Sequence, residues 1–156
     1  MPPHHATATP HDTSPLYVDL DGTLTLSDTL YESVMLLVRR NPLNLLRLLL
    51  WMLLGKAGFK HKLADAVRPD PARLPYHERF VQYLRDEHAR GRPLVLASAA
   101  DARIVGEVAA HFKFFDAVLG THGGTGGPNL SRAHKRAAID AHARAGGPTR
   151  WTYAGN

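Results

Sequence analysis

The sequence predicts an α/β fold with a Rossmann-like, doubly wound parallel sheet. Along its 156 residues, short apolar segments typical of buried strands alternate with longer segments of helical periodicity. Strands that are separated by helices pair in parallel, and the helices then cover both faces of the sheet. No internal repeat is visible in the sequence.

The expected elements follow one another in a regular order. Strands are expected at residues 16–18, 94–96, 115–119 and 151–154, where the apolar runs are short. Helices are expected at residues 28–39, 43–67, 74–90, 101–112 and 131–145, with proline or glycine at most of the breaks between them. In such a sheet, the loops at the carboxyl ends of the strands form the functional site.

Composition and charge limit the classes of function. Hydrophobic residues make up 44% and charged residues 21%, as in ordinary globular proteins, but residues 1–15 contain little to bury and are expected to be a disordered tail. The absence of cysteine excludes disulfides and thiol catalysis, and it suits a cytoplasmic protein. The net charge of +5 favours anionic partners, but we expect no specific nucleic-acid binding because no recognition motif accompanies it.

The segment 34–54 is rich in leucine but is not expected to span a membrane. The polar or helix-breaking residues that interrupt it are Arg39, Arg40, Asn41, Pro42, Asn44 and Arg47. Leucines flanked by basic residues are typical of helices in a membrane interface, which makes residues 43–62 a candidate contact with a membrane surface. The alternative is a buried or partner-facing helix with solvated basic ends.

The strongest chemical signal is the sequence YVDLDGTLT at residues 17–25. Asp19 and Asp21 follow a buried strand, and Gly22 allows a tight turn out of it. Alternate residues project to the same side, so both carboxylates can face one pocket. Two such groups can bind a divalent cation, and one can attack phosphorus while the other transfers a proton. A solvated Asp-Gly turn is the structural alternative.

This segment resembles motif I (DxDGT) of the haloacid dehalogenase-like (HAD) superfamily of phosphotransferases. The resemblance implies that Asp19 is the nucleophile that forms an aspartyl-phosphate and that Asp21 is the general acid/base. It also implies Mg²⁺ bound by the Asp19 side chain and the Asp21 backbone carbonyl. Thr23, within the same motif, is expected to contact the phosphate.

Later segments match the remaining motifs of the superfamily. Ser98 and the backbone of Ala99 are expected to bind the phosphoryl group, although a serine there could equally cap a helix. Lys135 is the candidate cation that neutralises the charge of the nucleophile. Arg132 could take this role instead, or Lys135 could be an ordinary solvated lysine on a helix. Asn156 stands where the first acid of the fourth motif is expected, which makes it the third candidate metal ligand. An asparagine can offer an oxygen to the metal but no charge.

A second set of matching segments covers nearly the whole chain: 19–24, 28–30, 40–42, 43–56, 74–76 and 97–101. On these segments, the stretch 15–156 is similar to the HAD-like domain that precedes UbiA-type prenyltransferase domains in some bacterial membrane proteins. This resemblance implies a single domain over residues 16–156, incomplete at its C-terminus, with a helical cap at about residues 28–72.

From the superfamily motifs, we expect a Mg²⁺-dependent phosphomonoester hydrolase that acts on a small phosphorylated substrate. The alternative is a non-catalytic, truncated module that associates with a membrane prenyltransferase or with the inner face of the membrane.

Overall fold

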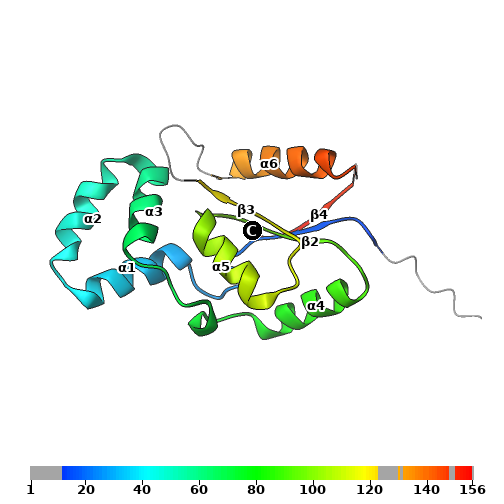
Figure 1. Ribbon diagram of the computed structural model, residues 1–156, viewed down its shortest axis with the longest axis horizontal. Helices are drawn as coiled ribbons and strands as arrows, with labels where there is room; N and C mark the ends of the chain where they lie inside the picture. Colours follow the sequence, from blue (N-terminus) through cyan, green and yellow to red (C-terminus); the bar gives the residue numbers. More distant parts are fainter. Residues whose placement is uncertain (1–11, 123–129, 131, 148–149, 156) are drawn as a thin grey trace, which may run out of the picture.

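The computed structural model describes residues 12–122, 130, 132–147 and 150–155, apart from the side chain of Arg132. Four strands form one parallel sheet in the order β3-β2-β1-β4 (Figure 1). The strands are β1 (Leu16–Val18), β2 (Leu94–Asp101), β3 (Ala117–Thr121) and β4 (Thr152–Ala154). The helices are α1 (Thr29–Arg40), α2 (Asn44–Met52), α3 (Gly55–Ala66), α4 (Glu78–Ala89), α5 (Ala102–Phe112) and α6 (Arg132–Ala145), with a 3-10 turn at Pro71–Arg73.

Helices cover both faces of the sheet, which confirms the predicted doubly wound α/β fold. Helices α4 and α5 lie on one face and α6 lies on the other (Figure 1). Leu16 and Val18 point into the core beneath α4 and α5, whereas Tyr17 points into the smaller core beneath α6. This alternation follows from the two-residue period of a strand and explains why all three residues are buried.

The two central strands end side by side, and this places the segments that follow them at one edge of the sheet. Val18 is in register with Leu96, so the chain leaves β1 and β2 in the same direction. Gly120 on β3 allows α5 to lie close to this edge, because a Cβ there would approach the Ala102 backbone to 2.5 Å. Gly22, at φ 71°, makes the tight turn that was expected after β1.

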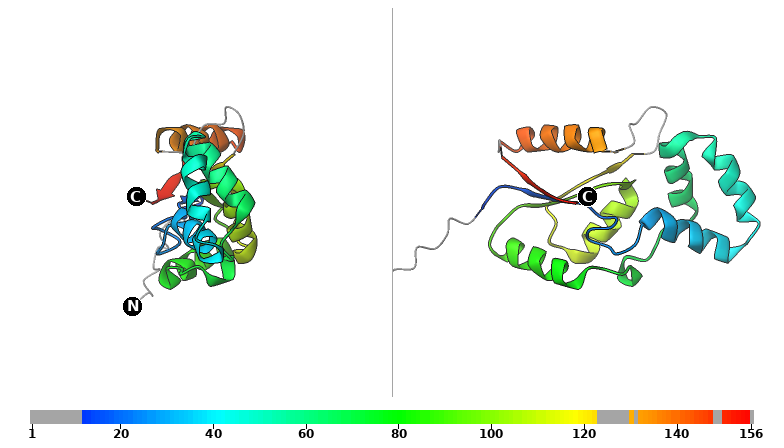
Figure 2. Two further views of the ribbon diagram at one scale, coloured as in Figure 1. Left: turned by 90° about the vertical axis from the view of Figure 1, so that its left-hand side faces the viewer. Right: turned by 180° about the vertical axis from the view of Figure 1, so that it is seen from behind.

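Helices α1, α2 and α3, which we call the cap, lie at the carboxyl ends of the strands (Figures 1 and 2). The cap has its own small core, in which Leu37, Leu48, Leu63 and Val67 are buried. The expected single helix at 43–67 is wrong, since α2 ends at Met52 and α3 starts at Gly55. Gly55 adopts φ 72°, a left-handed conformation that breaks the helix and lets α3 fold back on α2.

Other boundaries differ from the expected ones in smaller ways. Strand β2 continues to Asp101, beyond the apolar run that defined it, because β3 pairs with it as far as Thr121. Helix α4 begins at Glu78 instead of residue 74, since Pro75 precedes it and the 3-10 turn occupies residues 71–73.

Residues 12–15, expected to be part of a disordered tail, contact the domain. The buried Arg92 donates hydrogen bonds to the Ser14 carbonyl at 2.9 Å and to Asp12 at 3.0 Å. Arg92 also pairs with the buried Glu87 at 2.7 Å, so its charge is compensated inside the fold. Residues 1–11 of the expected tail lie outside the described residues.

Candidate active site

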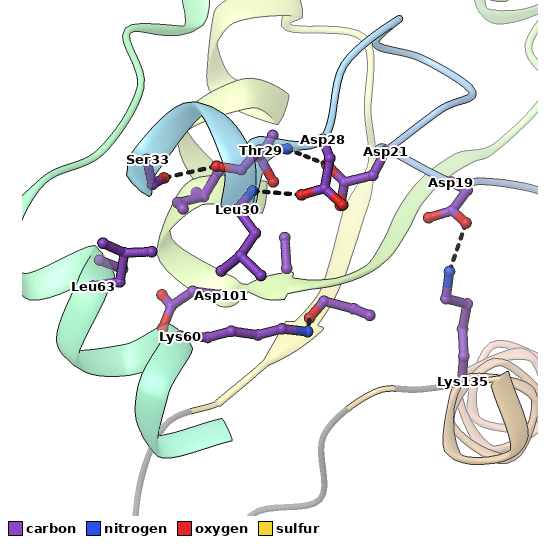
Figure 3. A pocket seen from close by; sticks show the side chains of 14 residues that line it. Asp19, Asp21, Asp28, Thr29, Leu30, Ser33, Lys60, Leu63, Asp101 and Lys135 are labelled. Atoms are coloured by element: carbon purple, nitrogen blue, oxygen red, sulfur yellow. Dashed lines mark hydrogen bonds and ion pairs between the residues drawn. The ribbon is translucent and has the colours of Figure 1, made fainter. Parts of the chain in front are cut away.

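Asp19 lies directly after β1 and is held from both sides. Its backbone N–H donates to the Ala154 carbonyl at 2.9 Å, which fixes it against β4. One carboxylate oxygen, Oδ1, accepts the Leu20 N–H at 2.9 Å. The other, Oδ2, lies 2.8 Å from Lys135 Nζ (Figure 3). It also accepts the Tyr153 hydroxyl at 3.0 Å. A lysine on α6 and a tyrosine on β4 therefore orient one aspartate at the edge of the sheet.

Asp21 is oriented by two donors and is disposed to keep a proton. Its Oδ1 accepts the Thr29 backbone N–H at 2.7 Å, and the Ser98 hydroxyl donates to Oδ2 over a long 3.4 Å. Burial raises the pKa of Asp21, and the negative charges of Asp28 and Asp19 act in the same direction, against the Thr29 hydrogen bond. Such a carboxyl group can act as a proton donor.

Ser98 and Ala99 continue β2 beside the two aspartates. Ser98 is fully buried, and its hydroxyl accepts the Ala100 N–H at 3.0 Å and reaches Asp21. Its side chain does not line the pocket that lies between the cap and the sheet. Ala99 does line that pocket. Its carbonyl accepts hydrogen bonds from Lys60 Nζ at 2.6 Å and from the Thr121 hydroxyl at 2.9 Å.

A pocket of about 230 Å³ lies between the cap and the carboxyl edge of the sheet (Figure 3). The sheet side of the pocket is formed by Asp19, Asp21, Ala99, Ala100, Asp101, Ile104 and Lys135. The cap side is formed by Asp28, Thr29, Leu30, Ser33, Lys60, Leu63 and Ala64. Charged groups therefore lie next to a small apolar wall, as is usual in sites for small molecules.

Three functional candidates were not predicted from the sequence with these roles. Lys60 lies in the segment 43–62 that was a candidate contact with a membrane surface, but it points into the pocket, and burial lowers its pKa. Tyr153 carried no local signal and reaches Asp19 only because β4 pairs with β1. Asp28 could have been found, since an acid just before a helix is a capping signal; it accepts the Leu30 N–H at 2.7 Å.

The other predicted site residues differ in how they relate to the pocket. Lys135 is buried against Asp19 and is therefore not the solvated lysine that was the alternative. Thr23 is half-buried in the turn after β1 and does not line the pocket. The side chain of Arg132, the alternative cation, and all of Asn156, the third candidate metal ligand, lie outside the described residues.

The two aspartates suit a hard divalent cation. Mg²⁺ prefers oxygen ligands and is commonly held by one or two carboxylates, several waters and the phosphate of a substrate. Asp19 and Asp21 supply such oxygens in one pocket, and a cation would offset the charges that raise the pKa of Asp21. Among the described residues, no group of three acids or histidines forms a closed, all-protein metal site.

A parallel α/β sheet with this aspartate pair at its carboxyl edge, facing a helical cap, defines a HAD-like domain. The sequence model of the haloacid dehalogenase-like hydrolase family matches residues 16–156, and the chain belongs to this family. In the part of the chain that the structure describes, no helix is both long and apolar enough to cross a bilayer.

The chain is also similar to individual proteins, one in sequence and two in structure. The chain is 35% identical, over 121 residues, to the uncharacterized protein y4nM of Sinorhizobium fredii, covering 78% of this chain and 23% of that protein. A Bordetella pertussis protein of unknown function has a similar structure (TM-score 0.63, 18% identity, 87% of this chain and 77% of that chain). The HAD family hydrolase t0658 of Salmonella enterica serovar Typhi also has a similar structure (TM-score 0.60, 12% identity). This similarity covers 90% of this chain and 55% of that chain. At these identities, the two structures support the fold only.

Proposed function

We propose that this domain is a Mg²⁺-dependent phosphomonoester hydrolase that acts through an aspartyl-phosphate intermediate. The observation that supports this proposal best is the arrangement around Asp19. This carboxylate follows a central strand, lines a pocket beside Asp21, and is paired with the buried Lys135 at 2.8 Å. A carboxylate, a cation and a proton donor in one pocket are the groups that phosphoryl transfer to an aspartate requires.

Lys135 and Tyr153 prepare Asp19 for attack on phosphorus. Both groups contact the same oxygen, Oδ2, and the lysine ammonium also donates to the tyrosine hydroxyl at 3.2 Å. These two contacts therefore hold the Asp19 carboxylate in one orientation. The lysine charge reduces the repulsion between this carboxylate and an approaching phosphate dianion, an effect that is strengthened by partial burial.

Asp21 supplies the proton that leaves with the alcohol. In the first step, an Asp19 oxygen forms a bond to phosphorus, the bond to the ester oxygen breaks, and the Asp21 proton moves to that oxygen. In the second step, the Asp21 carboxylate takes a proton from water, the water oxygen attacks phosphorus, and the bond between phosphorus and Asp19 breaks. Phosphate leaves, and both aspartates return to their initial protonation states.

The metal and the cap complete the proposed site. Mg²⁺ held by Asp19, Asp21 and Asn156 would neutralise the charge that develops on the transferred phosphoryl group. Lys60, which lines the cap side of the pocket, contributes a second positive charge for a phosphorylated substrate. The volume of about 230 Å³ favours a small leaving group over a macromolecule.

The test is phosphate release from p-nitrophenyl phosphate, with and without Mg²⁺. We expect Mg²⁺-dependent turnover that falls by at least about 10³-fold in Asp19→Asn, because the amide cannot act as the nucleophile. The matched control is Asp86→Asn, the same change at an exposed acid of α4, which should leave turnover unaltered. Absence of turnover in folded wild-type protein with Mg²⁺ would contradict the proposal and favour the non-catalytic module.

A further inference from the structure

Helix α2 buries one narrow stripe and exposes the rest of its apolar side chains. Asn44 and Leu48 face the cap core, and Trp51 is half-buried beside them. The exposed residues, which we call the leucine face, are Leu43, Leu45, Leu46, Leu49, Leu50, Met52, Leu53 and Leu54. Each is more than half exposed, and Leu53 reaches 83%. Single exposed leucines are common on protein surfaces, but a contiguous group of this kind marks an interaction surface.

The leucine face lies at an extremity of the molecule. In Figures 1 and 2, α2 forms the outer edge of the cap, on the side away from the sheet. No other described element covers it, since these side chains remain exposed in the folded domain. The helix has 9 residues, so it cannot span a bilayer, but it can lie flat on a surface.

The sequence segment that carries the leucine face has charges of one sign. Between Glu32 and Asp65 the sequence contains no acidic residue. The exposed basic residues in this interval are Arg39, Arg40, Arg47, Lys56 and Lys62, whereas Lys60 points into the pocket. Arg39 and Arg40 end α1, and Lys56 and Lys62 belong to α3, so cations lie on both elements that flank α2.

We propose that the leucine face docks the cap onto the surface of an anionic lipid bilayer. Such a surface offers a negatively charged layer above an apolar one, and the cap offers exposed leucines with cations on the neighbouring helices. The complete absence of carboxylates over this interval matches a partner that is negatively charged over its whole surface. A folded protein partner would more commonly present charges of both signs at its rim.

The test is co-sedimentation of the purified chain with vesicles, in the absence of Mg²⁺ and phosphorylated substrate. We expect binding to vesicles that contain phosphatidylglycerol, weaker binding to pure phosphatidylcholine, and a loss of binding as salt is raised. Leu50→Glu should weaken binding by about tenfold or more, because it would place a charge in the apolar layer. The matched control, Tyr83→Glu on α4, introduces the same negative charge at an exposed hydrophobic residue away from the cap and should not alter binding.

Two further variants separate the two contributions. Leu50→Ser removes the apolar group without adding a charge and should still weaken binding to all vesicles. Arg39→Gln combined with Lys56→Gln should weaken binding to anionic vesicles only. These residues are exposed, so circular dichroism should show unaltered folding.

Two results would overturn the proposal. One is a wild-type chain that stays in solution with every vesicle composition. The other is binding that Leu50→Glu leaves unaltered, which would mean that lipid contacts another surface. If vesicles are not bound but Leu50→Glu abolishes self-association, or capture of a membrane protein such as a prenyltransferase, the leucine face is a protein interface. Since the assay contains no substrate, its outcome is independent of the proposed hydrolase activity.

Discussion

At the scale of single residues, the acidity of Asp21 depends on neighbours that the pocket brings together. Burial and the charges of Asp28 and Asp19 raise its pKa, so its proton-donating form persists to higher pH than in an ordinary aspartic acid. For the proposed reaction, kcat/KM should fall as pH rises through this raised pKa. Asp28→Asn removes one negative charge, which lowers the pKa of Asp21, and the descending limb of the pH profile should move to lower pH.

The control for this prediction is another capping acid. Asn caps a helix nearly as well as Asp, so Asp28→Asn should keep the cap hydrogen bond to the Leu30 N–H. Asp70→Asn makes the same change at the cap of the 3-10 turn, outside the pocket, and should leave the pH profile in place. A limb that stays fixed or moves upward in Asp28→Asn would contradict the assigned electrostatic coupling.

The sequence predicted the candidate residues that belong to local motifs and missed those that depend on tertiary contacts. Asp19 and Asp21 were predictable because one turn after one strand positions both. Lys135 was predictable only as one of two cations, since its contact with Asp19 depends on how α6 packs. Tyr153 and Lys60 reach the pocket from other elements, and no spacing within the sequence encodes such contacts.

At the scale of elements, Leu48 should be the residue that holds α2 against the other two helices of the cap. It is 5% exposed and packs with Leu37, Leu63 and Val67. Leu48→Ala should lower the free energy of unfolding by about 2–4 kcal/mol, because it leaves a cavity in a small core. Leu49→Ala, the same substitution one residue further on, should alter it by less than about 0.5 kcal/mol. Equal losses in urea unfolding would show that α2 is packed in another orientation.

The alternation of strands and helices made the order of the elements predictable, but their exact ends depend on partners. Apolar runs located all four strands, because buried parallel strands need apolar side chains on both faces. They could not show that β2 extends to Asp101, because pairing with β3 continues past its apolar run. Likewise, continuous helix propensity concealed the break at Gly55, whose left-handed backbone is favoured by the packing of α3 on α2.

At the scale of the whole molecule, Arg103 links the cap to the sheet domain. It lies in the first turn of α5, and its guanidinium donates to Asp65 and to the His61 carbonyl on α3, the latter at 2.9 Å. It also donates to the buried Asp101 at 2.8 Å. Burial opposes ionisation of Asp101, but the hydrogen bonds from Arg103 outweigh it and lower the pKa of this acid. One side chain therefore satisfies a buried charge and holds α3 over the pocket.

Arg103→Met should loosen the cap while leaving the sheet folded. The free energy of unfolding should fall by about 1–3 kcal/mol, because Asp101 loses its charged partner. Amide hydrogen exchange should become faster in α3, and KM for the aryl phosphate should rise more than kcat falls, because Lys60 and Leu63 line the pocket from that helix. Arg68→Met removes an exposed ion pair between the segment that follows α3 and Glu107 on α5, and it should have a smaller effect. Faster exchange confined to the start of α5 would show that Arg103 only stabilises that helix, and the role in holding the cap would then be wrong.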